Sequence, residues 1–67
     1  MAEIKWIDKQ GQALTCHEKL KVLSENLSEL QLMAQDVFEA ALILSVDETQ
    51  IRKVMAKMIS DMENPYV

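Results

Sequence analysis

A heptad of apolar residues is the feature of this 67-residue chain that most constrains its fold. From Leu20 onward, apolar residues recur at alternating intervals of three and four without a slip. Spacing near 3.5 residues places such side chains on one seam of an α-helix that pairs with another helix. We expect this seam to be an oligomer interface. It consists of Leu20, Leu23, Leu27, Leu30, Ala34, Val37, Ala41 and Leu44.

A capping box marks where the first helix begins. Thr15 is followed three residues later by Glu18, a pattern in which the two residues satisfy backbone amides at a helix start. No Gly or Pro lies between Gly11 and Pro65 to interrupt a helix. The sequence therefore predicts a first helix over about residues 16–44.

A second helix comes after a short connection. Ser45 with Glu48, and Asp47 with Gln50, are overlapping capping patterns that predict a helix over about residues 48–62. Two helices joined by so short a connection run antiparallel, as a hairpin. The second helix carries an apolar stripe. The stripe consists of Ile51, Val54, Met55, Met58, Ile59 and Met62.

Residues 1–14 form a separate N-terminal arm, either a short hairpin or an irregular segment. The run from Asp8 to Gly11 predicts a turn, because Gly11 is the one residue of the arm that takes a positive φ without cost. Trp6 is the only Trp, and we expect it to anchor the arm on the helices. A Trp6 that faces a partner protein is the alternative.

The two expected helices differ in length, and this has a consequence for association. At 1.5 Å per residue the first helix is about 43 Å long and the second about 22 Å. The second helix therefore leaves Leu20, Leu23 and Leu27 uncovered. The N-terminal arm is one candidate to cover part of them, and we expect another chain to cover the rest. The expected fold is all-α: an antiparallel helical hairpin over residues 15–67 that assembles as a dimeric four-helix bundle. A tetramer, or a complex with a larger partner, stays open.

Charge limits the classes of partner. Eleven Asp and Glu against seven Lys and Arg give a net charge of −4 and a pI near 4.8. Nucleic-acid binders are usually basic, and anionic membranes attract polybasic segments, so both partners are disfavoured. The longest uncharged, mostly apolar run is the seven residues 40–46, whereas a membrane span needs about 20. We expect a cytoplasmic protein without a membrane segment.

Cys16 and His17 are the only adjacent pair with catalytic character. Neighbouring helix residues point about 100° apart, so the two side chains do not face each other, and no third catalytic member is visible. We expect no enzyme activity, no cofactor and no metal. A redox or metal-carrying accessory protein that uses Cys16 and His17 is the alternative.

Arg52, Lys53 and Lys57 form the only basic cluster. Glu48 stands four residues before Arg52, the order that favours an ion pair on a helix. We expect a solvated face here, and these three residues with Trp6 are the candidates for contacts with a partner protein. A DNA-binding regulator is a further alternative, although three cations are few against the net charge. The function expected first is that of a small non-enzymatic interaction protein: an adaptor, a regulator or an accessory subunit.

Overall fold

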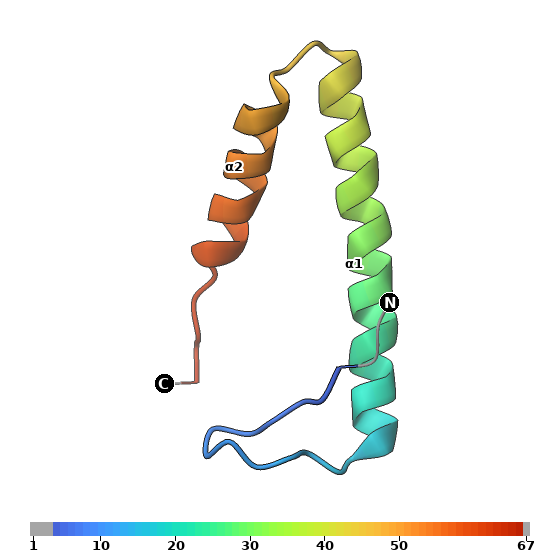
Figure 1. The fold of residues 1–67 in the computed structure, drawn as a ribbon, viewed down its shortest axis with the longest axis vertical. Helices are drawn as coiled ribbons and strands as arrows, with labels where there is room; N and C mark the ends of the chain where they lie inside the picture. The colour runs from blue at the N-terminus through green and yellow to red at the C-terminus, as the bar shows by residue number, and fades with distance from the viewer. Residues whose placement is uncertain (1–3, 67) are drawn as a thin grey trace. The chain divides into compact units, whose positions relative to one another are not determined.

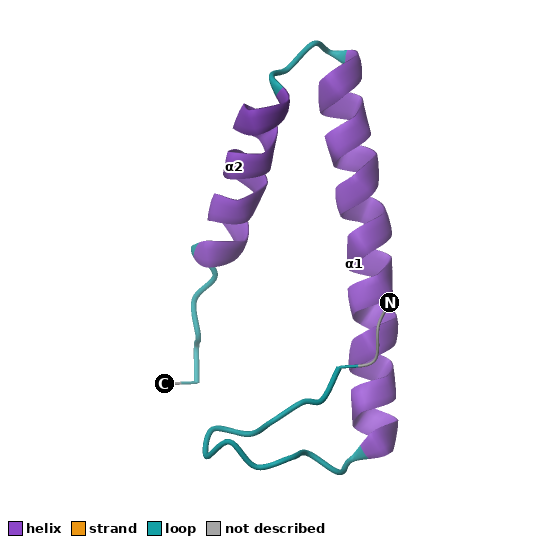
Figure 2. Ribbon diagram, in the orientation of Figure 1, coloured by secondary structure: helices purple, strands orange, loops and turns teal. Residues whose placement is uncertain are grey.

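The computed structural model describes residues 4–66 and contains two α-helices, α1 (His17–Ile43) and α2 (Glu48–Ser60) (Figure 1). No strand occurs within residues 4–66, and the segments outside the helices are loops and turns (Figure 2). The all-α prediction of a long and a shorter helix is confirmed. Neither helix combines the length and apolar character that crossing a membrane requires.

The structure divides into two compact units, residues 1–33 and 34–67, and the boundary lies inside α1. The first unit contains the N-terminal arm and the first half of α1. The second contains the end of α1, the connection and α2. Residues 1–3 of the expected arm, and residue 67, lie outside the described part of the chain.

The arm contains a tight turn closed by a single antiparallel bridge between Ile7 and Ala13. The amide of Gly11 donates to the carbonyl of Asp8 at 3.0 Å, and the amide of Asp8 donates to the carbonyl of Gln12 at 2.8 Å. Asp8 Oδ1 accepts from two further amides of the turn, each at 2.9 Å. Gly11 has φ 83°, the left-handed conformation for which the sequence singled it out.

The start of α1 lies one residue later than the capping box predicts. The carbonyl of Cys16 accepts from the amide of Leu20 at 3.0 Å, so Cys16 holds the N-cap position. Thr15 therefore stands outside the cap, and Glu18 becomes the second helical residue instead of the third. Glu18 still lies in the first turn, where its negative charge suits the helix dipole.

The end of α1 is a Schellman motif. Ser45 has φ 66°, and its amide donates to the carbonyl of Leu42 at 3.0 Å. The amide of Val46 donates to the carbonyl of Ala41, also at 3.0 Å. This pair of bonds satisfies two carbonyls at the helix end, and the motif commonly brings the two outer residues into apolar contact. Val46 is half-buried and Ala41 is buried.

Only one of the two predicted capping patterns opens α2. Asp47 is the N-cap, and its Oδ2 accepts from the amide of Gln50 at 2.9 Å. The expectation that Ser45 also caps α2 was wrong. Ser45 has the left-handed backbone conformation that ends α1, and Asp47 is the N-cap of α2. Glu48 is the first residue of α2 and places an acidic group at the positive end of the helix.

Within residues 34–66 the two helices contact each other, and their least exposed residues form a short row on each helix. On α1 the row is Ala34, Phe38 and Ala41, spaced four and three residues apart, so that it lies on one face. On α2 the row is Ile51 and Met55. Ala41, 9% exposed, is the only buried hydrophobic residue in the described part of the chain, and the other four are half-buried. The hairpin therefore has a very small core.

Candidate functional site

The predicted seam of α1 separates into two rows that differ in exposure. The inner row is buried or half-buried. It consists of Leu20, Leu27, Ala34 and Ala41. The outer row is exposed. It consists of Leu23 (39%), Leu30 (52%), Val37 (49%) and Leu44 (77%). Leu44 lies just beyond the last residue of α1, so the helical part of the outer row ends at Val37.

Contacts inside residues 34–66 explain why the inner row is covered there. Phe38 follows the inner row on the side away from Val37, and the guanidinium of Arg52 lies 4.5 Å from the centre of the Phe38 ring. α2 is therefore seated over Ala34, Phe38 and Ala41. Val37 lies on the opposite edge of that row and stays exposed.

α2 presents exposed apolar residues to the same side of the hairpin as Val37. Arg52 lies on one edge of the covered row of α2, over Phe38. Val54 (48% exposed) and Met58 (67% exposed) lie on the opposite edge, by helical spacing. In an antiparallel pair the side opposite Phe38 and Arg52 is shared by both helices. Val37, Val54 and Met58 therefore belong to one face, which we call the apolar face.

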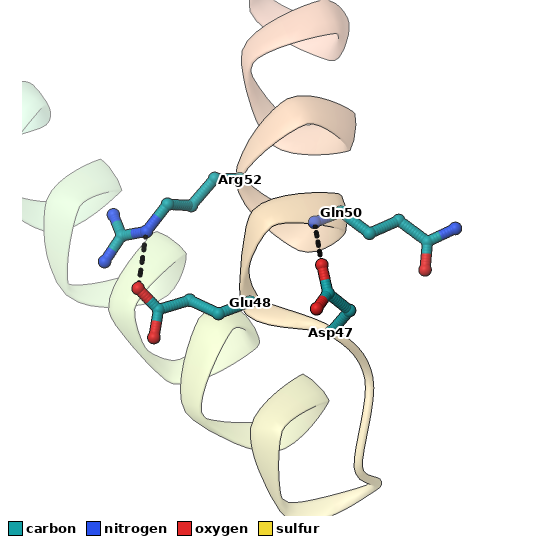
Figure 3. Close-up of polar contacts among 4 residues, drawn as sticks. All are labelled: Asp47, Glu48, Gln50 and Arg52. Carbon is teal, nitrogen blue, oxygen red and sulfur yellow. Dashed lines mark hydrogen bonds and ion pairs between the residues drawn. The ribbon is translucent and has the colours of Figure 1, made fainter.

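The other side of the hairpin carries an ion pair within α2. Arg52 Nε donates to Glu48 Oε2 at 3.1 Å, one turn away on α2, beside the Asp47 cap (Figure 3). The pair is more than half exposed on both side chains, so it contributes little alone. The guanidinium of the same Arg52 lies over Phe38, and a cation above an aromatic ring is attracted to it.

The predicted partner contacts belong to both units of the chain, Trp6 to the first and the three cations to the second. Arg52 is occupied by Glu48 and Phe38, and Lys57 Nζ lies 2.7 Å from Asp61 Oδ2 at the end of α2. Lys53 is exposed on α2. Trp6 is half-buried in the N-terminal arm. Two of the three cations of the basic cluster, Arg52 and Lys57, therefore form ion pairs with acidic residues of the same chain.

Cys16 and His17 are both exposed at the start of α1, where Cys16 contributes its carbonyl to the cap. Within residues 4–66 no three His, Cys, Asp or Glu side chains lie close enough together to hold a metal ion. The Cys16–His17 pair therefore has no further ligand from the described part of this chain.

Sequence reasoning missed the stacking of Arg52 on Phe38 and the exposure of Val54 and Met58. A signal for the first was present. In an antiparallel hairpin that turns at Ser45, residues whose numbers add to about 90 lie level with each other, and Phe38 and Arg52 meet that condition. The exposure of Val54 and Met58 had no such signal, because an apolar stripe does not show which of its edges is covered.

Comparison with known proteins adds no relative: no known protein family, no curated protein and no solved structure shows significant similarity to this chain.

Proposed function

We propose that the protein is a small, non-enzymatic, cytoplasmic interaction protein, an adaptor, regulator or accessory subunit, that works as a homodimer. Its interaction surface is the outer row of α1 together with the apolar face of the hairpin. One observation carries the proposal: Leu23, Leu30 and Val37 follow a coiled-coil repeat yet remain between 39% and 52% exposed. A reducing compartment also suits the free thiol of Cys16.

The free energy available from covering this surface is large for so small a chain. Full burial of one such side chain stabilises by about 1.5–3 kcal/mol. Covering the exposed fractions of Leu23, Leu30, Val37, Val54 and Met58 therefore contributes about 4–8 kcal/mol per copy. The whole stability of a small domain is about 5–15 kcal/mol. A second chain on this surface thus adds stability comparable to that of the fold.

Charge does not oppose pairing of two copies through the seam, even though each carries a net charge of −4. Most charged residues of α1 lie at heptad positions that point away from the seam. They are Glu18, Lys21, Glu25, Glu29, Asp36 and Glu39. Lys19 is the only Lys, Arg, Asp or Glu in α1 that flanks the seam. Two copies can therefore approach without bringing acidic side chains face to face.

The test is sedimentation equilibrium at low micromolar concentration, with two matched variants. Leu30→Glu places a charge in the outer row, whereas Leu32→Glu places the same charge on the far side of α1, at a residue that is 69% exposed. We expect a wild-type dimer, at least a 30-fold weaker dimer for Leu30→Glu, and a wild-type dimer for Leu32→Glu. The factor reflects about 1–2 kcal/mol of lost burial on each of two copies.

Two results would contradict the proposal. The first is a folded wild-type monomer at this concentration. The second is equal dissociation of both variants, which would mean that charge alone, and not its place on α1, weakens the dimer. Circular dichroism of each variant shows whether its helices are intact.

A further inference from the structure

We infer that Met58 is a peroxide-sensitive modification site, and that oxidation of its thioether to the sulfoxide dissociates the proposed homodimer. The inference rests on that homodimer and adds a means of regulating it. Three observations carry it: the composition of the proposed interaction surface, the exposure of Met58, and the lack of a hydrogen-bond donor among its apolar neighbours.

Met58 is the only methionine of the proposed interaction surface. The other members of that surface are Leu23, Leu30, Val37, Leu44 and Val54. Leu and Val side chains contain only carbon and hydrogen, whereas the sulfur of Met is oxidised readily and reversibly. A mild oxidant therefore changes the polarity of this surface at one side chain per copy.

Met58 is open to water in the single hairpin. It is 67% exposed on α2, whereas Met55, three residues earlier, is half-buried. Met62 is 75% exposed, but it lies beyond the last residue of α2, where its amide donates to the carbonyl of Ile59 at 3.2 Å. A peroxide therefore reaches Met58 and Met62 more easily than Met55, and of these three only Met58 belongs to the apolar face.

The reaction transfers one oxygen atom from hydrogen peroxide to the sulfur of Met58. A lone pair of the sulfur attacks one peroxide oxygen, so that an S–O bond forms and the O–O bond breaks. The proton on the transferred oxygen passes to the departing hydroxide, which leaves as water. The sulfur loses two electrons and the peroxide gains them, and the product is a polar sulfoxide.

A sulfoxide oxygen in the apolar face finds no donor there. Val37 and Val54 have no hydrogen-bond donor in their side chains, and the backbone amides beside Met58 are bonded within α2. Burial of an unpaired polar group disfavours the state that buries it. Oxidised Met58 therefore favours the free hairpin, in which water solvates the sulfoxide, over the dimer.

The proposed dimer covers Met58, so oxidation proceeds through the free hairpin. Each dissociation exposes the side chain, and the sulfoxide then hinders re-association, so peroxide draws the equilibrium toward monomers. The oxidation rate of Met58 should fall as the protein concentration rises through the Kd of the dimer. The oxidation rate of Met62, outside the apolar face, should not change.

Sedimentation equilibrium before and after treatment with hydrogen peroxide tests the inference. The starting protein carries Cys16→Ser, because peroxide also oxidises thiols, and Met33→Leu, because Met33 is 67% exposed and lies one turn before Val37. Met58→Leu and Met62→Leu, each added to this protein, are the matched pair. Leu has nearly the volume of Met and resists peroxide. Mass spectrometry of peptides shows which sulfurs carry oxygen, and circular dichroism shows whether the helices are intact.

We expect oxidation to weaken the dimer by about 10-fold or more in the starting protein and in Met62→Leu, and by less than about 3-fold in Met58→Leu. Treatment with methionine sulfoxide reductases should restore the dimer.

Three results would overturn the inference and leave the proposed homodimer intact. The first is an equal loss of affinity in Met58→Leu. The second is an unchanged dimer in protein whose Met58 carries the oxygen. The third is an oxidation rate at Met58 that does not depend on protein concentration. A monomer before any oxidation would overturn both proposals.

Discussion

The left-handed residue that ends α1 gives a prediction whose sign is set by backbone conformation alone. Ser45 has φ 66°, where an L side chain costs about 1–2 kcal/mol and Gly costs nothing. Ser45→Gly removes this cost but increases the conformational freedom of the unfolded chain, which offsets about 0.5–1 kcal/mol. We expect Ser45→Gly to raise the free energy of unfolding by about 0.5–1 kcal/mol.

A matched substitution elsewhere in the chain should have the opposite effect. Ser28 lies in the interior of α1 and is exposed, so Ser28→Gly makes the same chemical change in a residue that is helical. Gly is less favourable than Ser in a helix interior by about 0.5 kcal/mol. The two variants therefore isolate the conformation of the residue from the loss of its hydroxymethyl group.

Thermal unfolding followed by circular dichroism at 222 nm measures both changes. All samples need one protein concentration, because the Tm of a self-associating protein depends on it. A change of 1 kcal/mol shifts Tm by about 4–8 °C in a domain of this size. We expect Ser45→Gly to raise Tm by about 2–8 °C and Ser28→Gly to lower it by about 2–4 °C. A decrease for Ser45→Gly as large as that of Ser28→Gly would refute the assignment of the turn.

Three further changes probe other contacts, each by a different measurement. Asp47→Ala removes the side chain that accepts from Gln50, and it should lower the free energy of unfolding by about 1 kcal/mol in urea titration, whereas Asp47→Ser should restore most of the loss. Arg52→Gln removes both the ion pair and the cation over Phe38, so it should cost about 1 kcal/mol, and 0.5 M NaCl should narrow the difference from wild type because salt screens the ion pair. A Cβ added by Gly11→Ala meets no atom within 4 Å, so this substitution destabilises the arm only because residue 11 has φ 83°. Faster hydrogen exchange at amides of the arm, with unchanged helical signal, is the expected result, and unchanged exchange there would count against the turn.

The two helices could be predicted from the sequence because their signals are local. The heptad requires only that apolar residues recur at the right interval, and a run without Gly or Pro lets the helix continue. The connection was predicted less well. Ser45 and Asp47 both stand three residues before a suitable partner, so spacing alone cannot choose between them. The choice depends on where α1 ends, and the Schellman motif that ends it carries Ser where Gly is the usual signal.

The candidate site was predicted as one seam, whereas the structure divides it into two rows. A heptad reports which residues avoid water, but it does not report whether the covering helix belongs to the same chain. Within residues 34–66 that division depends on the position of α2, which the contact between Arg52 and Phe38 shows. The same contact explains why Arg52, one of the three cations expected to meet a partner, acts within the chain.

Side-chain size along the seam gives a physical reason for the position of that division. The inner row carries Leu20 and Leu27 in the first half of α1, and then Ala34 and Ala41 where α2 packs. Helices approach more closely where the contact residues are small, and two Ala leave room for Ile51 and Met55 of α2. The outer row does not make this change: Leu23, Leu30 and Val37 stay large through both halves. Large side chains at a regular repeat suit a second helix at ordinary packing distance, and α2 is already engaged on the inner row. The outer row is therefore the part of the seam that suits the second chain of the proposed homodimer.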